Sequence, residues 1–184
     1  MKIQRALLID HDDSFTQNIR SWLSEKFDVT IINHTEISEF KKISEFDLIV
    51  MSPGPRSPQD YPHSLKFLSE LNHSQYVLGI CLGMQMMTVA CGGTVQTYTP
   101  PYHGKTSTLE SADQKINGQT VARYHSIICQ LPENQFELIA TSDQLPMWIL
   151  HTEKNWMGMQ FHPESFLTVS PEIYLNAVLQ WISK

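Results

Sequence analysis

Short hydrophobic runs alternate with amphipathic segments through the first half of the chain. Four of these runs predict buried strands, at residues 6–10, 29–33, 47–52 and 76–80. Residues 14–27 repeat apolar side chains at helical spacing and predict a helix. Three residues stand where the N-cap of this helix is expected: Asp12, Asp13 and Ser14. A second helix is predicted through Leu65, Leu68 and Leu71. This alternation predicts an α/β fold with a mostly parallel, doubly wound sheet and helices on both faces.

The second half of the chain has a different pattern, in which short strand-like pieces are separated by Gly, Pro and Asn. These pieces predict an antiparallel extension of the sheet. A last helix is predicted from Pro171, a residue that suits the first turn, to Lys184. Because no repeat or low-complexity linker interrupts the pattern, we expect a single three-layer domain over residues 1–184.

Composition narrows the classes of function. The formal net charge is -6 and there is no cluster of Lys and Arg, so we expect no nucleic-acid partner. The chain starts with a strand pattern and contains no apolar run near the ~18 residues that cross a bilayer, so we expect no membrane segment. Three cysteines without a C-x-x-C pair argue against a disulfide framework or structural zinc. We therefore expect a reduced, cytoplasmic protein.

Cys81 lies in the stretch LGICLGMQMM, directly after the predicted strand 76–80. Active sites of open parallel sheets lie beyond the carboxyl ends of the strands. Gly79 and Gly83 flank the cysteine with the spacing of a nucleophile elbow, a tight turn that presents a side chain at the start of a helix and favours a thiolate there. Cys81 is our candidate nucleophile; the alternative is a buried cysteine that packs as a small hydrophobe. Cys91 and Cys129 lack this setting, and we expect them to be inert.

The stretch GMQFHPES supplies a candidate base, His162, and a group to orient it, Glu164. Both can point from one strand end toward the cysteine, because Pro163 ends the strand between them. We expect His162 to accept and return the proton and Glu164 to fix its tautomer. A metal site at His-x-Glu needs further ligands that the spacing does not supply, so we expect no metal here.

The tetrapeptide SPGP, residues 52–55, follows the third predicted strand. The backbone N–H groups of Gly54 and of Leu82, the residue after the nucleophile, are candidate donors to the oxyanion of an acyl transfer. In isolation such a tetrapeptide is more often a plain turn. Its place at the end of a neighbouring strand favours the functional interpretation.

Taken together, SPGP, GICLGMQ and FHPES resemble, in this order, the motifs of the class I glutamine amidotransferases with a Cys-His-Glu triad. The stretches HGK at 103–105 and RYHS at 123–126 match as well, so the resemblance covers essentially the whole chain. It implies a triad of Cys81, His162 and Glu164. It also implies a glutamine site formed by Gly54, Pro55, Arg56, Leu82, Gln85, Ser126 and Ile127.

The stretch DHDDSFTQN at 10–18 is similar to the signature of the amidotransferase subunits of anthranilate synthase and of aminodeoxychorismate synthase. The resemblance implies hydrolysis of L-glutamine through a glutamyl thioester at Cys81. It further implies a partner that receives the ammonia, a chorismate-using synthase subunit (component I of either enzyme). Mg²⁺ is expected in that partner, and no cofactor is expected in this chain.

Two residues depart from the pattern of the family. Arg56 stands where glycine is usual, and Met84 replaces a histidine frequent in the subgroup. Three other interpretations stay open. They are an amidotransferase for another acceptor, such as an imidazole glycerol phosphate or carbamoyl phosphate system, a stand-alone γ-glutamyl hydrolase, and a binding module with a merely structural cysteine.

Overall fold

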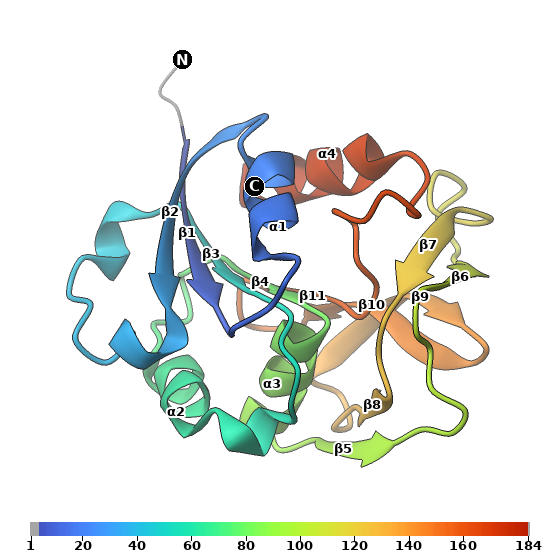
Figure 1. The fold of residues 1–184 in the computed structure, drawn as a ribbon, viewed down its shortest axis with the longest axis horizontal. Coiled ribbons are helices and arrows are strands. Elements are labelled where there is room, and N and C mark those ends of the chain that lie inside the picture. The colour runs from blue at the N-terminus through green and yellow to red at the C-terminus, as the bar shows by residue number, and fades with distance from the viewer. Residues whose placement is uncertain (1–3, 184) are drawn as a thin grey trace.

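The computed structural model describes residues 4–183, which are built around a seven-stranded sheet (Figure 1). Five strands are parallel to their neighbours in the order β2-β1-β3-β4-β11. Their bounds are β1 (Gln4–Asp10), β2 (Phe27–Asn33), β3 (Leu48–Met51), β4 (Val77–Ile80) and β11 (Trp156–Met159). The predicted α/β class with a mostly parallel sheet is confirmed.

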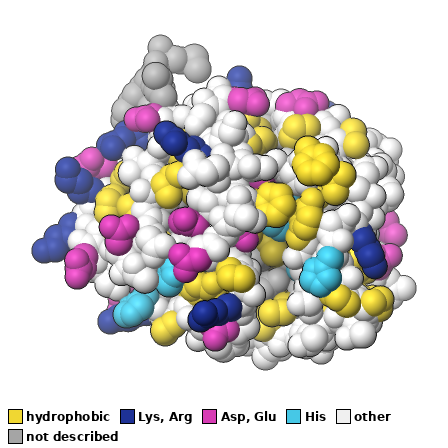
Figure 2. Space-filling model, in the orientation of Figure 1, with side chains coloured by type: hydrophobic (Ala, Val, Ile, Leu, Met, Phe, Trp, Pro, Cys, Tyr) yellow, Lys and Arg dark blue, Asp and Glu magenta, His cyan; other side chains and the backbone are white. Residues whose placement is uncertain are grey.

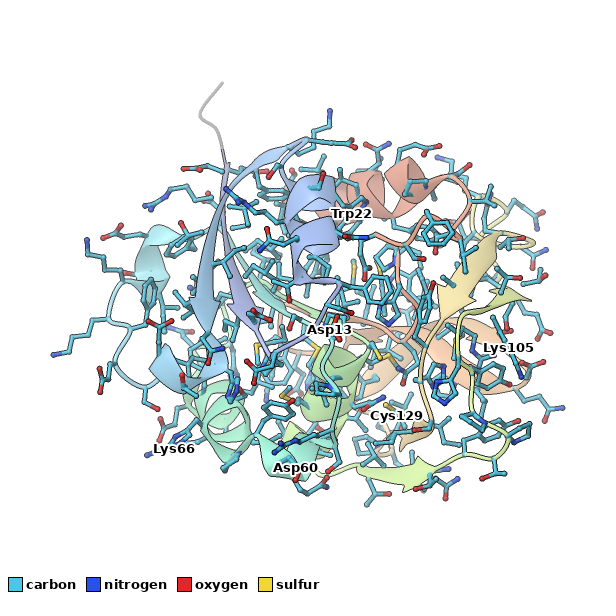
Figure 3. All side chains as sticks on the ribbon, viewed as in Figure 1. Asp13, Trp22, Asp60, Lys66, Lys105 and Cys129 are labelled. Atoms are coloured by element: carbon cyan, nitrogen blue, oxygen red, sulfur yellow. The ribbon has the colours of Figure 1, made fainter. Side chains whose placement is uncertain are left out.

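Helices cover both faces of this sheet. The helices are α1 (Thr16–Leu23), α2 (Pro62–Glu70), α3 (Leu82–Ala90) and α4 (Pro171–Ile182). Alternate residues of β1 point to opposite faces: Leu8 packs in one core with α1 and α4, and Leu7 packs in the other with α2 and α3. Trp22 ties α1 to α4, because its Nε1 donates to the carbonyl of Pro171 at 3.2 Å (Figure 3).

The second half contributes an edge to the main sheet and two separate ribbons. Strands β9 (Phe136–Ser142) and β10 (Leu145–His151) extend the sheet antiparallel beyond β11, as predicted. The piece WMGMQF, also expected in this extension, forms β11 instead and pairs parallel with β4, because it fills the place between β4 and β10. The remaining pieces of the second half do not join the main sheet. Two ribbons form instead, one from β5 (Thr94–Thr97) and β8 (Ile127–Gln130) and one from β6 (Lys105–Thr108) and β7 (Thr120–Arg123). Strands β5 (TVQT) and β6 (KTST) are mostly exposed and contain one apolar residue between them, Val95, which packs against the small core around Met84, so they lack the apolar faces of the central strands.

The start of α1 also differs from the prediction. The helix is shorter than 14–27, since the chain already enters β2 at Phe27, and its N-cap residue is Phe15. Phe15 has no side-chain oxygen, and no side-chain hydrogen bond caps the start of the helix among the described residues. Instead Asp13 holds the turn before the helix, because its Oδ1 accepts the N–H of Phe15 at 2.7 Å. Asp10 accepts the hydroxyl of Thr16 at 2.6 Å and closes the same turn.

Three single 3-10 turns complete the chain, at His34–Glu36, Ile43–Glu45 and Pro58–Asp60. No helix within residues 4–183 is long and apolar enough to cross a membrane. The predicted end of the last helix, Lys184, lies outside the described residues.

Candidate active site

Four loops meet at the carboxyl edge of the parallel strands. His11 follows β1, Ser52 follows β3 and Cys81 follows β4, while His162 lies three residues beyond β11. These strands are neighbours in the sheet, so their ends lie side by side. The topology therefore brings the candidate nucleophile and base together although they are far apart in the sequence.

Cys81 has a backbone conformation that non-glycine residues rarely adopt, with φ +52° and ψ -102°. Such strain persists only where the surroundings enforce it, and it is concentrated at functional sites. The Cys81 N–H donates to the carbonyl of Met159 at 2.7 Å, which ties the turn to β11. A Cβ added at Gly79 would lie 2.5 Å from the carbonyl carbon of Gly83, and one added at Gly83 would overlap the backbone oxygen of Met51. Both positions therefore require glycine, because neighbouring backbone lies too close to leave room for a side chain.

His162 and Glu164 form a buried pair. Nδ1 of His162 lies 2.7 Å from Oε1 of Glu164, and the two side chains are 2% and 0% exposed. Burial alone lowers the pKa of His162, but the carboxylate of Glu164 and the sulfur of Cys81 raise it well above its ordinary value. Since Nδ1 faces Glu164, Nε2 is the nitrogen left for Cys81, and it has no hydrogen-bond partner among residues 4–183.

Two aromatic rings hold the imidazole in place. The ring of Phe15 lies 5.3 Å from that of His162, and the ring of Tyr124 lies 5.1 Å from it, edge to face. The two rings also contact each other at 4.9 Å. The hydroxyl of Tyr124 lies 3.2 Å from that of Ser165, on the loop that carries the histidine. Asp13, whose carboxylate holds the backbone of Phe15, lies at the centre of Figure 3.

A cavity of about 250 Å³ opens at Cys81. Its lining consists of Gly54, Pro55, Arg56, Cys81, Gln85, His103, Tyr124, His125, Ser126 and Ile127. All the residues expected to bind glutamine line it except Leu82. That residue is buried beneath the loop, so close that a Cβ added at Gly54 would lie 2.5 Å from its side chain. As the first residue of α3, Leu82 has an N–H without a partner inside the helix.

Hydrogen bonds fix the polar wall of the cavity. Gln85 donates from Nε2 to the carbonyl of Ile127 and to Oε1 of Gln160, each at 3.3 Å. His125 donates from Nδ1 to the same carbonyl at 2.9 Å. The ring is neutral, because burial, and then the charge of Arg123, lower the pKa of His125 to about 3. A carbonyl can only accept, so the NH2 group of the Gln85 amide faces the Ile127 carbonyl, and the amide oxygen points elsewhere and can accept other hydrogen bonds.

Arg123 supports this wall from behind. Its side chain is fully buried, and its guanidinium lies 3.3 Å from the ring centre of Tyr102. Nε donates to Nε2 of His125 at 3.1 Å, and Nη1 pairs with Oδ2 of Asp143 at 2.8 Å. The sequence patterns HGK and RYHS marked this part of the chain, but individual roles for His103, Arg123, Tyr124 and His125 were not predicted.

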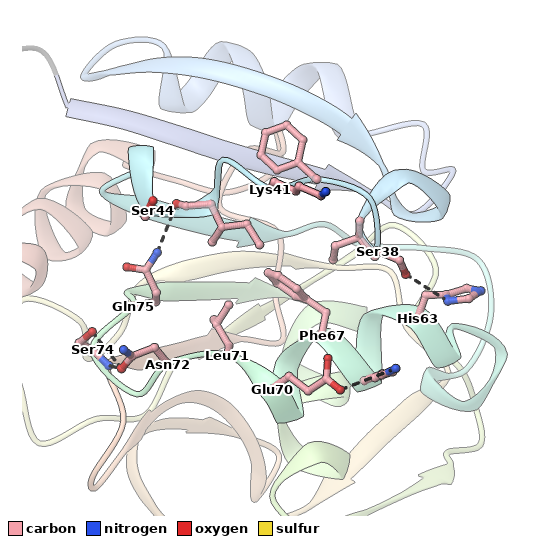
Figure 4. A pocket seen from close by; sticks show the side chains of 14 residues that line it. Ser38, Lys41, Ser44, His63, Phe67, Glu70, Leu71, Asn72, Ser74 and Gln75 are labelled. Atoms are coloured by element: carbon pink, nitrogen blue, oxygen red, sulfur yellow. Dashed lines mark hydrogen bonds and ion pairs between the residues drawn. The ribbon is translucent and has the colours of Figure 1, made fainter.

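A larger hollow of about 600 Å³ lies elsewhere, between residues 37–44 and α2 (Figure 4). Figure 4 shows apolar side chains such as Phe67 and Leu71 in it, with polar ones at the rim. Its lining contains neither a cysteine nor a histidine paired with a carboxylate. The smaller cavity at Cys81 is therefore the candidate active site, because it combines a nucleophile with a base.

Comparison with known proteins assigns the family. The sequence profile of the glutamine amidotransferase class-I family matches residues 7–181. The chain belongs to this family. The resemblance found in the sequence motifs is thereby confirmed, and with it the expectation that the protein is an enzyme.

Relatives of this amidotransferase carry a common name. "Anthranilate synthase component 2, pyocyanine specific" from Pseudomonas aeruginosa is 36% identical over 193 residues, covering 96% of this chain and 94% of that protein. A protein of Azospirillum brasilense named "Anthranilate synthase" is 32% identical over 175 residues, covering 90% of this chain but only 24% of that longer protein. The crystal structure of a glutamine amidotransferase from Thermotoga maritima aligns with a TM-score of 0.74 at 17% identity, covering 100% of this chain and 97% of that one, which shows a shared fold.

The two departures from the family pattern have different surroundings in this amidotransferase. Arg56 lines the cavity, where a charge can meet a bound molecule. Met84 is fully buried and packs with Cys129 and Ile149 in a small core. A Cβ added at Gly158 would lie 2.8 Å from its side chain. Met84 therefore acts in packing, whereas Arg56 stands at the site.

Proposed function

We propose that the chain hydrolyses L-glutamine at Cys81 and delivers the ammonia to a chorismate-using synthase, anthranilate synthase component I. The observation that carries the proposal is the strained Cys81 at the mouth of a cavity, beside the buried pair of His162 and Glu164 on the adjoining strand end. This is the arrangement that thiol acyl transfer requires: a nucleophile, a base and a group that orients the base.

In the first half of the reaction the thiolate of Cys81 attacks the carboxamide carbon of glutamine. The carbonyl oxygen becomes an oxyanion, which the N–H groups of Gly54 and Leu82 stabilise. The carbon–nitrogen bond then breaks, and the leaving NH2 group takes the proton from Nε2 of the His162 imidazolium. The products of this half are ammonia, a glutamyl thioester and neutral His162.

In the second half water attacks the thioester carbonyl and gives a proton to Nε2 of His162. The carbon–sulfur bond breaks, the new γ-carboxyl group loses the second proton of the water to solvent, glutamate leaves, and the thiolate and imidazolium are restored. Glu164 keeps Nδ1 protonated throughout and stabilises the imidazolium. The proposal assigns no cofactor to this chain and Mg²⁺ to the partner.

The names of the relatives and the exposed apolar side chains support the proposal that the chain works with a partner subunit. Ammonia released into neutral water is mostly protonated and is no longer a nucleophile, so a second active site must receive it directly. In the longer Azospirillum protein the matching segment is a minor part of one chain named as the whole enzyme. Two residues beyond Glu164, Phe166 is 86% exposed, and Val169 is 53% exposed. Figure 2 shows hydrophobic side chains exposed on the face of the molecule that it draws, and contiguous exposed apolar side chains are typical of protein–protein contact.

The test is glutamate release from glutamine by the purified chain, alone and with a purified anthranilate synthase component I plus chorismate. We expect slow hydrolysis alone and a marked acceleration with both additions, because we propose that occupancy of the partner's active site is coupled to glutamine hydrolysis at Cys81. Equal rates in both conditions would refute the coupling. Acceleration only by aminodeoxychorismate synthase component I would move the acceptor to that enzyme.

The three cysteines are free and buried, and we place the reaction in the reducing cytoplasm.

A further inference from the structure

His11, in the stretch DHDDSFTQN, is a buried histidine with a partner on every polar atom of its ring. It is 0% exposed, and Nδ1 lies 3.1 Å from the hydroxyl of Ser52 while Nε2 lies 3.0 Å from the hydroxyl of Ser64. Ser52 begins the loop that carries Gly54, and Ser64 belongs to α2. The mechanism described above does not use any of the three side chains.

The directions of these hydrogen bonds can be assigned one after another. The Ser52 hydroxyl donates its only proton to the carbonyl of Pro53 at 2.7 Å. It must therefore accept at its oxygen, which receives the backbone N–H of His11 at 2.9 Å and also Nδ1–H of the ring. The ring is neutral, because burial, and then neighbouring His34, lower the pKa of His11 to about 3. Nε2 is consequently an acceptor, and the Ser64 hydroxyl donates to it.

This relay ends on one peptide bond, that between Pro53 and Gly54. Within residues 4–183 the only cis peptide is Thr99–Pro100, so the Pro53–Gly54 bond is trans. In a trans peptide the C=O and N–H groups point in opposite directions. Holding the Pro53 carbonyl against Ser52 thus directs the Gly54 N–H away from Ser52. Gly54 lines the cavity together with Cys81.

We infer that His11 is a positioning residue for the oxyanion donor: through Ser52 it fixes the orientation of the Pro53–Gly54 peptide and so aims the Gly54 N–H into the cavity. The inference rests on the proposed glutaminase function and deepens it. Ser64 contributes by holding the tautomer in which Nδ1 donates.

The packing around His11 leaves the loop little freedom to rotate. A Cβ added at Gly54 would lie 3.0 Å from the Cβ and from the carbonyl oxygen of His11. The Tyr61 hydroxyl donates to that same carbonyl at 3.2 Å, and the Tyr61 ring meets the imidazole edge to face at 5.2 Å. His34 stacks on the imidazole at 5.7 Å, and its own ring meets that of Tyr61 edge to face at 4.9 Å. The imidazole is therefore held rigidly enough to hold Ser52 in turn.

The test compares two reactions of Cys81 in the complex with anthranilate synthase component I. Glutamine hydrolysis passes through an oxyanion, whereas alkylation by iodoacetamide does not. We expect His11→Leu and Ser52→Ala to lower kcat about 10- to 100-fold, less than the loss of a whole oxyanion donor, with KM for glutamine and the alkylation rate within about twofold of wild type. His11→Asn keeps an N–H donor near the position of Nδ1, and we expect it to retain a higher kcat than His11→Leu.

Ser69→Ala is the matched control, since Ser69 is an exposed serine of the same helix as Ser64. We expect its kcat to equal that of wild type. Unchanged kcat in both His11→Leu and Ser52→Ala overturns the inference, and so does an alkylation rate that falls in parallel with kcat, because general disruption of the site then explains both. A wild-type complex that releases no glutamate overturns the proposed function itself, whereas an active wild type with fully active variants overturns only the role of His11.

Discussion

Replacing Glu164 with Gln removes one buried charge and keeps the shape of the side chain. In the structure the Glu164 carboxylate is fully buried and lies 2.7 Å from Nδ1 of His162. An amide oxygen in that place can still accept the Nδ1 proton, so the tautomer is retained while the imidazolium loses its counter-charge. The variant therefore isolates the electrostatic effect of the pair from its orienting effect.

The raised pKa of His162 determines the sign of the effect on stability. The stabilisation of the folded state by the pair of His162 and Glu164 is fully present below the unfolded histidine pKa of about 6.5. It is lost as the pH rises through the raised folded pKa of His162. Hydrogen bonds to charged groups contribute about 1.5–3 kcal/mol, against about 0.5–1.5 kcal/mol for neutral ones. At pH 6 the variant should thus be less stable by about 1–2 kcal/mol. The difference should shrink at higher pH, with a slope of at most about 1.4 kcal/mol per pH unit.

The assay is urea unfolding of wild type and Glu164→Gln at several values between pH 6 and 9. Glu133→Gln is the control, because Glu133 is an exposed carboxylate in a loop, and its difference from wild type should stay near zero at each pH. A difference between wild type and Glu164→Gln that stays constant or grows as the pH rises would refute the assignment of a charged pair.

Two further predictions concern the frame of the site. Gly83→Ala places a carbon against the backbone oxygen of Met51, so we expect a loss of at least about 1–3 kcal/mol and a melting temperature lower by at least about 2–4 °C; an unchanged melting temperature would contradict the tight elbow. Asp143→Ala leaves the buried Arg123 without its carboxylate, and because Asp143 is 55% exposed we expect about 1–3 kcal/mol rather than the larger loss of a fully buried pair. Urea unfolding measures this loss, and a wild-type midpoint would show that the pair does not contribute.

The parallel half of the fold could be predicted because its signals are local. Strands β1, β3 and β4 each contain a continuous apolar run, and β2 has a mixed run rich in β-branched residues. The glycines on both sides of Cys81 indicate a tight turn from their spacing alone. The placement of Cys81 next to His162 is a different matter. It results from the pairing of β4 with β11, which no local pattern encodes. The position of His162 after a strand-like piece made the meeting with Cys81 possible, and the resemblance to a family indicated it.

The two ribbons and the supporting residues of the site escaped prediction for a related reason. A short run such as TVQT has the same alternation whether it pairs in the main sheet or with β8, so its partner depends on tertiary packing. Phe15 and Tyr124 contact His162 from segments distant in the sequence. Asp12 to Ser14 were expected to cap a helix, and the structure instead uses Asp13 to hold Phe15 over the histidine.

The central claim is that Cys81 generates ammonia for a chorismate-using partner. The most direct measurement is anthranilate formation from chorismate by purified anthranilate synthase component I with this chain, supplied with glutamine or with ammonium salt, for wild type and Cys81→Ala. We predict that glutamine supports product formation only with the wild-type chain, and that ammonium supports it equally with either. Glutamine-dependent anthranilate formation that persists in Cys81→Ala would contradict the account.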